Sequence, residues 1–446
     1  MKTLFPKQQE VANRFIQLHK NNKHTLDSSD VGTGKTVVAA FIAKELGLPV
    51  AVICPKAVIP AWDRELIEMG VEPEFVLNYE KLRTGKTAFM KKRGKRSMKW
   101  DLPEGTLVLV DEVHKCKGPW TQNAYLLISL VSQGFRVHAM SATAAEDPTE
   151  MRALGYMLGL HFLNKHPCSW TTWMDQYGCY QDHWGKWHSG SKEHLKKLHE
   201  RIYEDVKHED AFPNINWPGD KNYARAAKLR VKDFPDSFKH NRVFVEPVEF
   251  KNASRILEAY DSLGITPAVV EEYIEAGTVT DSAHALVNIL RARQLAESFK
   301  VPCLADMASN YESQGMSVVL FVNFRETADA LCESLSCPSV VGGQSVAKRQ
   351  EAIDDFQSDA SHILVVNIAA GGTGLSLHDT KGKRPRISLI SPTFSAKEHL
   401  QALGRIHRNG AQSDAIQKIL VAADSVEEDV MKSIKRKSAN LKALHG

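Results

Sequence analysis

The sequence predicts an α/β protein with two domains of parallel sheets flanked by helices and a mainly helical insert between them. Apolar, β-branched runs such as Leu48–Cys54, Thr106–Val110 and Ser317–Val322 are typical of strands buried on both faces of a parallel sheet. Between such runs the apolar residues recur at helical spacing, as in Gln9–Leu18. A chain of 446 residues is long enough for about three domains.

The composition is that of a globular protein, with 43% hydrophobic and 25% charged residues. The formal net charge of +4 permits a polyanionic partner without requiring one. Seven scattered cysteines without a C-x-x-C pair indicate reduced thiols rather than a disulfide framework. No segment resembles a signal peptide or a membrane span, so we expect a cytoplasmic protein without a membrane partner.

The stretch Ser28–Thr36 (SSDVGTGKT) follows a weak strand pattern and precedes the apolar helical run Val37–Ala43. Glycines at this point leave backbone N–H groups accessible at a helix N-terminus, which is typical of a phosphate-binding P-loop. A glycine turn that caps an ordinary helix is the alternative. The expected nucleotide-binding residues of this loop are Gly32, Thr33, Gly34, Lys35 and Thr36.

Side chains of the loop and of the upstream helix predict the cofactors ATP and Mg²⁺. Lys35 is expected between the β- and γ-phosphates, and the Thr36 hydroxyl is expected to hold Mg²⁺. Ser29 occupies the position of the motif's first glycine, and a small residue there still permits a tight turn. Gln8 is a candidate adenine reader because its amide both donates and accepts hydrogen bonds, although a surface glutamine would look the same.

An acidic pair follows the predicted strand at Thr106–Val110, about 75 residues after Lys35. Asp111 is suited to hold Mg²⁺, while Glu112 is suited to orient and deprotonate the attacking water. Together they predict a nucleotide-hydrolysing site.

Two hydroxyls follow a third strand predicted at Phe135–Met140. Ser141 and Thr143 are candidates for coupling the nucleotide pocket to a neighbouring domain, and a helix cap is the alternative.

Two further segments have open interpretations. Thr84–Trp100 carries only basic charges, which suits either a solvated loop or contacts with nucleic-acid phosphates. Five of the eight tryptophans lie between 160 and 285, and the pair Trp170 and Trp173 fits either a small helical core or a surface that stacks on unpaired nucleotides. The cysteines and histidines of this region have no standard zinc-site spacing.

The order of the motifs resembles that of superfamily-2 helicases. P-K-Q, GTGKT, CPK, DEVH and SAT look like the first motor domain of that superfamily. The strand Ser317–Val322 followed by NFRE, the strand Ile363–Asn367 followed by AAGGTGLSL, and QALGRIHR on a predicted helix look like the second. Within the superfamily, GRIHRNGAQ and AAGGTGLSL are most similar to motifs of the Swi/Snf-like branch, although SAT and DEVH replace its usual SGT and DEAH.

The resemblance implies two RecA-like domains, at 1–160 and 286–446, with the insert at 161–285. Arg405 and Arg408 are three apart and would share one helix face, from which both guanidinium groups would reach a γ-phosphate as arginine fingers. Gly374 is expected at the nucleotide and Gln401 in coupling. The nucleic-acid contacts implied by the family are Lys56, Tyr79, Arg83, Asn323, Arg325, Gly371 and Gly372.

We therefore expect a monomeric ATP hydrolase that translocates on duplex, forked or junction DNA. Small size and the aromatic insert favour remodelling of branched DNA, including branch migration during repair, recombination or replication. An RNA-directed ATPase of the same superfamily and an ATP-gated nucleic-acid clamp without processive movement are the alternatives.

Overall fold

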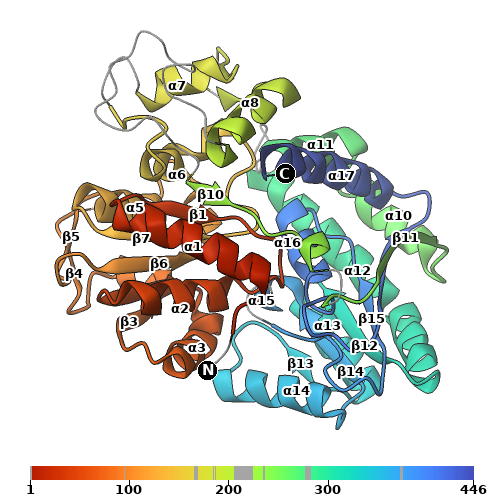
Figure 1. Cartoon of the computed structure of the whole chain (residues 1–446). Helices are drawn as coiled ribbons and strands as arrows, with labels where there is room; N and C mark the ends of the chain where they lie inside the picture. Colours follow the sequence, from red (N-terminus) through yellow and green to blue (C-terminus); the bar gives the residue numbers. More distant parts are fainter. Residues whose placement is uncertain are drawn as a thin grey trace. The chain divides into compact units, whose positions relative to one another are not determined.

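The computed structural model describes residues 3–94, 96–164, 169–183, 185, 187–204, 225–234, 237–276, 283–371 and 375–445. The chain forms two compact units, each built on one parallel sheet (Figure 1). Unit 1 comprises Met1–Asp233 and Ala439–Gly446, and unit 2 comprises Phe234–Ser438. Residues 161–285, expected as a mainly helical insert, thus contribute to both units. The three-part division of the chain stays a prediction.

The sheet of unit 1 has the strand order β10-β1-β7-β6-β2-β3, and all of its pairs are parallel. Its strands are β1 (Thr25–Asp27), β2 (Val50–Cys54), β3 (Pro73–Asn78), β6 (Leu107–Asp111), β7 (Arg136–Met140) and β10 (Ala226–Ala227). Because β1, β7 and β6 are consecutive, the segments that leave their carboxyl ends meet at one edge of the sheet.

Both faces of this sheet are buried, which explains the continuous apolar strands. Val50 and Val52 pack with helices on one face, whereas Ala51 and Ile53 pack on the other. The first face is covered by α1 (Pro6–Lys20), α2 (Lys35–Leu46) and α3 (Ile59–Met69). The second is covered by α5 (Gln122–Ser132), α6 (Arg152–Met157), α7 (Trp170–Gln176) and α8 (Lys192–Tyr203).

The tryptophan pair of α7 belongs to this second core. Trp170 and Trp173 are buried, which confirms the packing interpretation for both. Smaller elements of unit 1 are α4 (Tyr79–Arg83), the hairpin of β4 (Met90–Lys92) and β5 (Met98–Trp100), and the pair β8 (Tyr180–Gln181) and β9 (Trp187–His188).

The sheet of unit 2 has the order β11-β16-β15-β12-β14-β13 and is also parallel throughout. Its strands are β11 (Asn241–Val248), β12 (Ser317–Val322), β13 (Ser339–Val340), β14 (Ile363–Asn367), β15 (Arg386–Ile390) and β16 (Ala415–Ala422). Its helices are α10 (Ala253–Asp261), α11 (Pro267–Ala276), α12 (Ala283–Ser313), α13 (Arg325–Leu335), α14 (Val346–Ser358), α15 (Ile368–Gly371) and α16 (Ala396–Leu403). The last helix, α17 (Val426–His445), begins in unit 2, and its final residues belong to unit 1.

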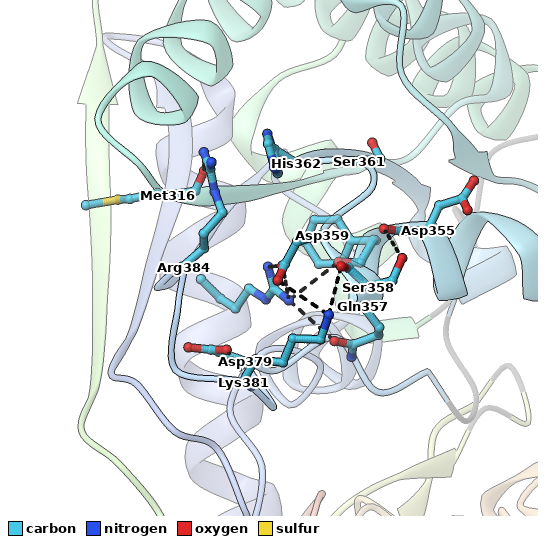
Figure 2. A network of polar contacts seen from close by, with 12 residues as sticks. Met316, Asp355, Gln357, Ser358, Asp359, Ser361, His362, Asp379, Lys381 and Arg384 are labelled. Atoms are coloured by element: carbon cyan, nitrogen blue, oxygen red, sulfur yellow. Dashed lines mark hydrogen bonds and ion pairs between the residues drawn. The ribbon is translucent and has the colours of Figure 1, made fainter.

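A buried arginine fixes the start of β15 in unit 2. Arg386 is 1% exposed and its guanidinium lies over the Phe356 ring. It donates to Asp359 Oδ1 and Gln357 Oε1, each at 3.4 Å, within the polar network shown in Figure 2. Lys381 also lies in this network, 3.7 Å from the Asp359 carboxylate. The buried charge is thus paired, as burial requires.

None of the helices in the described ranges is both long enough and apolar enough to cross a membrane.

Candidate nucleotide-binding site

The predicted P-loop connects β1 to α2, and its glycines have backbone conformations that other residues rarely adopt. Gly32 has φ +86° and Gly34, the N-cap of α2, has φ +90°. A Cβ atom at Gly34 would also lie 2.6 Å from Gln8 Nε2. The conformation of Gly34 therefore favours glycine, and a Cβ there would also displace the Gln8 amide.

Gln8 fastens the start of α1 to this loop. Its Nε2 donates to the Thr33 carbonyl (2.7 Å), and its Oε1 accepts from the Phe5 backbone N–H (2.9 Å). The side chain is buried. Adenine recognition by Gln8 stays a prediction. The structure shows in addition that Gln8 contacts the P-loop.

Lys35 folds back over the loop that precedes it. Its Nζ donates to the carbonyls of Ser29 (2.7 Å) and Asp30 (3.0 Å). An ammonium held at this point can exchange carbonyl oxygens for phosphate oxygens, which are stronger acceptors because they are charged. Thr36 lies beside it in the first turn of α2 and is half-buried.

The segment after β10 runs along the P-loop, which sequence reasoning did not predict. Ser29 Oγ accepts from the Leu229 N–H (2.9 Å), and Asp30 Oδ2 accepts from the Val231 N–H (3.1 Å). The serine that replaces the motif's first glycine therefore anchors a second chain segment. Nothing local signals this contact, because about 200 residues separate the partners.

The acidic pair lies at the carboxyl end of β6. Asp111 Oδ2 accepts from Trp62 Nε1 (3.0 Å), and its Oδ1 accepts from the Glu112 N–H (2.9 Å). Burial, followed by the charge of Glu112, raises the pKa of Asp111 to about 7. Sequence reasoning did not predict that Trp62 contacts this carboxylate.

Glu112 is held in the left-handed region, at φ +53° and ψ +50°. Its Oε2 lies 3.0 Å from His114 Nδ1, which also lies 3.0 Å from Ser141 Oγ. The Thr143 N–H donates to the same hydroxyl (3.3 Å). DEVH and SAT are thus joined by hydrogen bonds between segments that follow neighbouring strands. Ser141 reaches the acidic pair through His114, and Thr143 contacts Ser141.

Thr36 and Asp111 are the residues expected to hold Mg²⁺, and their oxygen donors suit a hard cation. Burial and the adjacent Glu112 both raise the pKa of Asp111, and a cation beside the two carboxylates would stabilise their charged forms. In the described ranges no cluster of three or more His, Cys, Asp or Glu side chains could hold a metal. A site of one carboxylate and one hydroxyl fits a Mg²⁺ ion that keeps several waters and binds substrate phosphates.

The two arginines predicted as arginine fingers lie in unit 2 but not on a helix. The helix α16 ends at Leu403. Arg405 lies in the turn that follows and Arg408 lies just beyond it, outside any helix or strand, so the predicted shared helix face is wrong. Arg405 Nη1 donates to the Leu375 carbonyl (3.4 Å), and Arg408 Nη1 donates to Ser376 Oγ (3.0 Å). Both side chains therefore contact the end of the AAGGTGLSL motif.

Tyr79 was expected at a nucleic-acid interface, but the structure places it inside unit 1. Its ring is 1% exposed, and its hydroxyl donates to the Asp111 carbonyl (2.6 Å). Burial removes this ring from any surface contact, so Tyr79 supports the acidic site. Lys56 is exposed beyond the end of β2, and the half-exposed Arg83 lies 3.5 Å from Glu80.

Three predicted residues of unit 2 follow adjacent strands. Asn323, after β12, donates from Nδ2 to Glu297 Oε2 (2.6 Å), and its carbonyl accepts from Asn367 at the end of β14 (2.8 Å). Arg325 is exposed and donates to the Gly342 carbonyl (3.2 Å). Gly371 ends α15, whereas Gly372 and Gly374 lie outside the described residues.

Gln401, the last predicted coupling residue, is buried on α16.

Comparisons with known proteins agree with these motifs. Residues 300–410 match the family model described as the helicase conserved C-terminal domain. A putative ATP-dependent RNA helicase of Acanthamoeba polyphaga mimivirus is 30% identical over 467 residues, covering 99% of this chain and 83% of the relative. An uncharacterized ATP-dependent helicase of Bacillus subtilis is 21% identical, covering 98% of this chain and 78% of the relative.

A shorter match comes from Arabidopsis thaliana. A putative SWI/SNF-related matrix-associated actin-dependent regulator of chromatin is 28% identical over 160 residues, covering 34% of this chain and 18% of that relative. Because the mimivirus relative reaches 30% identity over most of its own length, these similarities identify a family. The chain belongs to the Swi/Snf-like helicases of superfamily 2, whose members hydrolyse ATP as helicases or translocases.

Proposed function

We propose that this enzyme is a DNA translocase that acts on duplex or branched DNA, such as forks and Holliday junctions. One observation supports ATP hydrolysis as the source of energy for this activity. The P-loop, the acidic pair and Ser141 lie together at the ends of β1, β6 and β7. The chromatin regulator among the curated relatives supports DNA as the partner. The Swi/Snf-like tail GRIHRNGAQ supports the same choice.

In this proposal the P-loop binds the triphosphate of ATP. Lys35 releases the carbonyls of Ser29 and Asp30 to bind the β- and γ-phosphates, while Thr36 and Asp111 hold Mg²⁺. The cation supplies charge neutralisation at the phosphates when it is bound.

The chemical step would be carried out by Glu112, which orients the attacking water and accepts its proton. His114, which also contacts Ser141, would hold the Glu112 carboxylate in place. Arg405 and Arg408 are proposed to neutralise the charge that develops on the γ-phosphate. Loss of that charge contact after hydrolysis would switch the grip on DNA.

An RNA-directed ATPase is the second candidate. It is favoured by one observation, the name of the mimivirus relative, which is a putative ATP-dependent RNA helicase. The two candidates differ in which polymer stimulates ATP turnover.

The test is steady-state ATPase activity with single-stranded, duplex, forked and four-way-junction DNA and with RNA. We expect DNA to stimulate turnover more than RNA does, with branched DNA the strongest. Lys35→Ala should lose nearly all hydrolysis and keep nucleic-acid binding, whereas Lys20→Ala, at an exposed lysine of α1, should behave as wild type. Equal turnover on linear and junction DNA without junction movement would refute the branched-DNA role, and stronger stimulation by RNA would favour the second candidate.

A further inference from the structure

The all-basic stretch forms a firmly anchored hairpin rather than a loose loop. Its strands β4 and β5 pair in antiparallel fashion, and Met90, Met98 and Trp100 are buried in the core of unit 1. The Trp100 indole donates to Ser129 Oγ on α5 (2.8 Å). The hairpin therefore presents its outward side chains from a fixed position.

Those outward side chains are cations without acidic neighbours on the hairpin. Residues 84–100 contain seven lysines and arginines and no acid. Lys91 and Lys99 are directly opposed across the strand pair, and both are exposed. Like charges in this position destabilise a hairpin, so the arrangement costs stability unless an anion lies against it.

The acid nearest to this stretch in the sequence is Asp101, which directly follows β5 and whose backbone N–H donates to the Phe89 carbonyl (2.8 Å). One carboxylate at the base of the hairpin leaves most of the seven positive charges unmatched.

An exposed tryptophan adjoins the tip of this hairpin. The side chain of Trp120 is 58% exposed, and the Arg96 guanidinium lies 5.8 Å from its ring centroid. Arg152 lies 4.1 Å from the same centroid and donates to the Pro119 carbonyl (3.0 Å). Trp170 contacts the ring edge-on at 6.0 Å. The indole is thus held in place while more than half of it faces solvent.

We propose that the hairpin and Trp120 bind an unpaired DNA strand. Lys91, Lys99 and Arg93 contact consecutive phosphates, and one base stacks on Trp120. An unpaired strand fits better than a duplex because it exposes the faces of its bases, which can stack on the exposed part of the Trp120 ring. The inference rests on the proposed function, since it assigns part of the DNA partner to a surface of unit 1.

The electrostatic part is tested by binding of a labelled single-stranded oligonucleotide over a series of salt concentrations. The full chain carries Lys91→Gln with Lys99→Gln, and the matched control carries Lys20→Gln with Lys383→Gln, two exposed lysines that do not belong to the hairpin. We expect the first pair to reduce the slope of log K against log salt by about 1.4, or roughly 0.7 per lost phosphate contact. An unchanged slope, equal to that of the control pair, would overturn the proposal.

The stacking part is tested by Trp120→Ala and Trp120→Phe. We expect the alanine variant to bind the single strand about tenfold more weakly, because base–aromatic stacking contributes roughly 1–3 kcal/mol. The phenylalanine variant should recover most of that affinity, and binding to blunt duplex should not change. Equal losses for single strand and duplex would overturn the assignment to an unpaired strand. If wild-type protein binds no nucleic acid, the proposed function fails instead.

Discussion

At the scale of single residues, Gly34 shows how two separate constraints meet at one position. Its φ of +90° favours glycine, and a Cβ would lie 2.6 Å from Gln8 Nε2. Gly47, at the other end of α2, also has a positive φ but has open space around the position of a Cβ. Comparing alanine substitutions at the two glycines therefore separates the effect of backbone strain from the effect of a steric clash.

We expect Gly34→Ala to abolish ATP binding and Gly47→Ala to preserve it. Both variants should lose about 1 kcal/mol of unfolding free energy to backbone strain, since an L-residue in this region costs roughly 1–2 kcal/mol. Only Gly34→Ala also displaces Gln8 and with it the loop. Calorimetric titration with a non-hydrolysable ATP analogue, together with thermal unfolding, measures both effects. Normal nucleotide affinity in Gly34→Ala would show that the loop tolerates the displacement.

Sequence reasoning at this scale identified residue types but not their partners. Ser29 was interpreted as a tolerated substitute for glycine, whereas its hydroxyl accepts from Leu229. Tyr79 was placed at a surface, whereas it contacts Asp111. Both partners come from distant segments, so no local pattern contains the information.

At the scale of elements, strands buried on both faces were the easiest to predict. The predicted strands Ser317–Val322 and Ile363–Asn367 agree with β12 and β14 in every residue. Both strands are buried along their whole length and are apolar except for Ser317 at the start of β12 and Asn367 at the end of β14, so the apolar run marks each strand clearly. The hairpin β4–β5 was missed because exposed lysines interrupt its apolar pattern. The helix α16 was predicted too long, because Gly404 ends it before the arginines.

One buried network joins three elements of unit 1. The Thr25 hydroxyl on β1 lies 2.9 Å from His19 Nε2 on α1 and 2.7 Å from His138 Nδ1 on β7. Burial lowers the pKa of His19 to about 3, with His24 and Arg136 adding to the effect. Burial, and the neighbouring His19, also lower the pKa of His138 well below its usual value. Both histidines are therefore neutral in the folded protein.

This network predicts that unit 1 loses stability in acid. Below about pH 6.5 the unfolded chain binds protons that the folded histidines do not, so the contribution is complete above pH 6.5 and falls as the pH decreases. Between pH 6.5 and pH 5, wild-type protein should lose about 2 kcal/mol more of its unfolding free energy than His138→Gln does. Urea unfolding at a series of pH values measures the slope, with the exposed His183→Gln as control. Equal slopes for wild type and His138→Gln would contradict the assignment.

At the scale of the whole molecule, the order of the motifs predicted two α/β domains with parallel sheets. It did not predict that the C-terminal residues of the chain belong to unit 1. The last residues of α17 pack into unit 1, where His445 Nε2 lies 2.7 Å from the Ala145 carbonyl. The Tyr203 hydroxyl lies 2.8 Å from His445 Nδ1 and 2.6 Å from Ser28 Oγ. Residues some 300 positions apart in the chain make these contacts, and no periodic pattern in the sequence predicts them.

This chain of contacts predicts energetic coupling between the C-terminal segment and the P-loop. Tyr203→Phe removes the shared hydroxyl, and His445→Ala removes its partner, so the double variant should lose about 1 kcal/mol less than the sum of the single losses. The unfolding transition that shifts with ADP identifies unit 1, because ADP binds the P-loop but lacks the γ-phosphate that the arginines of unit 2 are proposed to contact. The exposed Tyr180→Phe serves as control. Additive losses, with unchanged ATP affinity in both single variants, would mean that the C-terminal contact stabilises unit 1 without reaching the nucleotide loop.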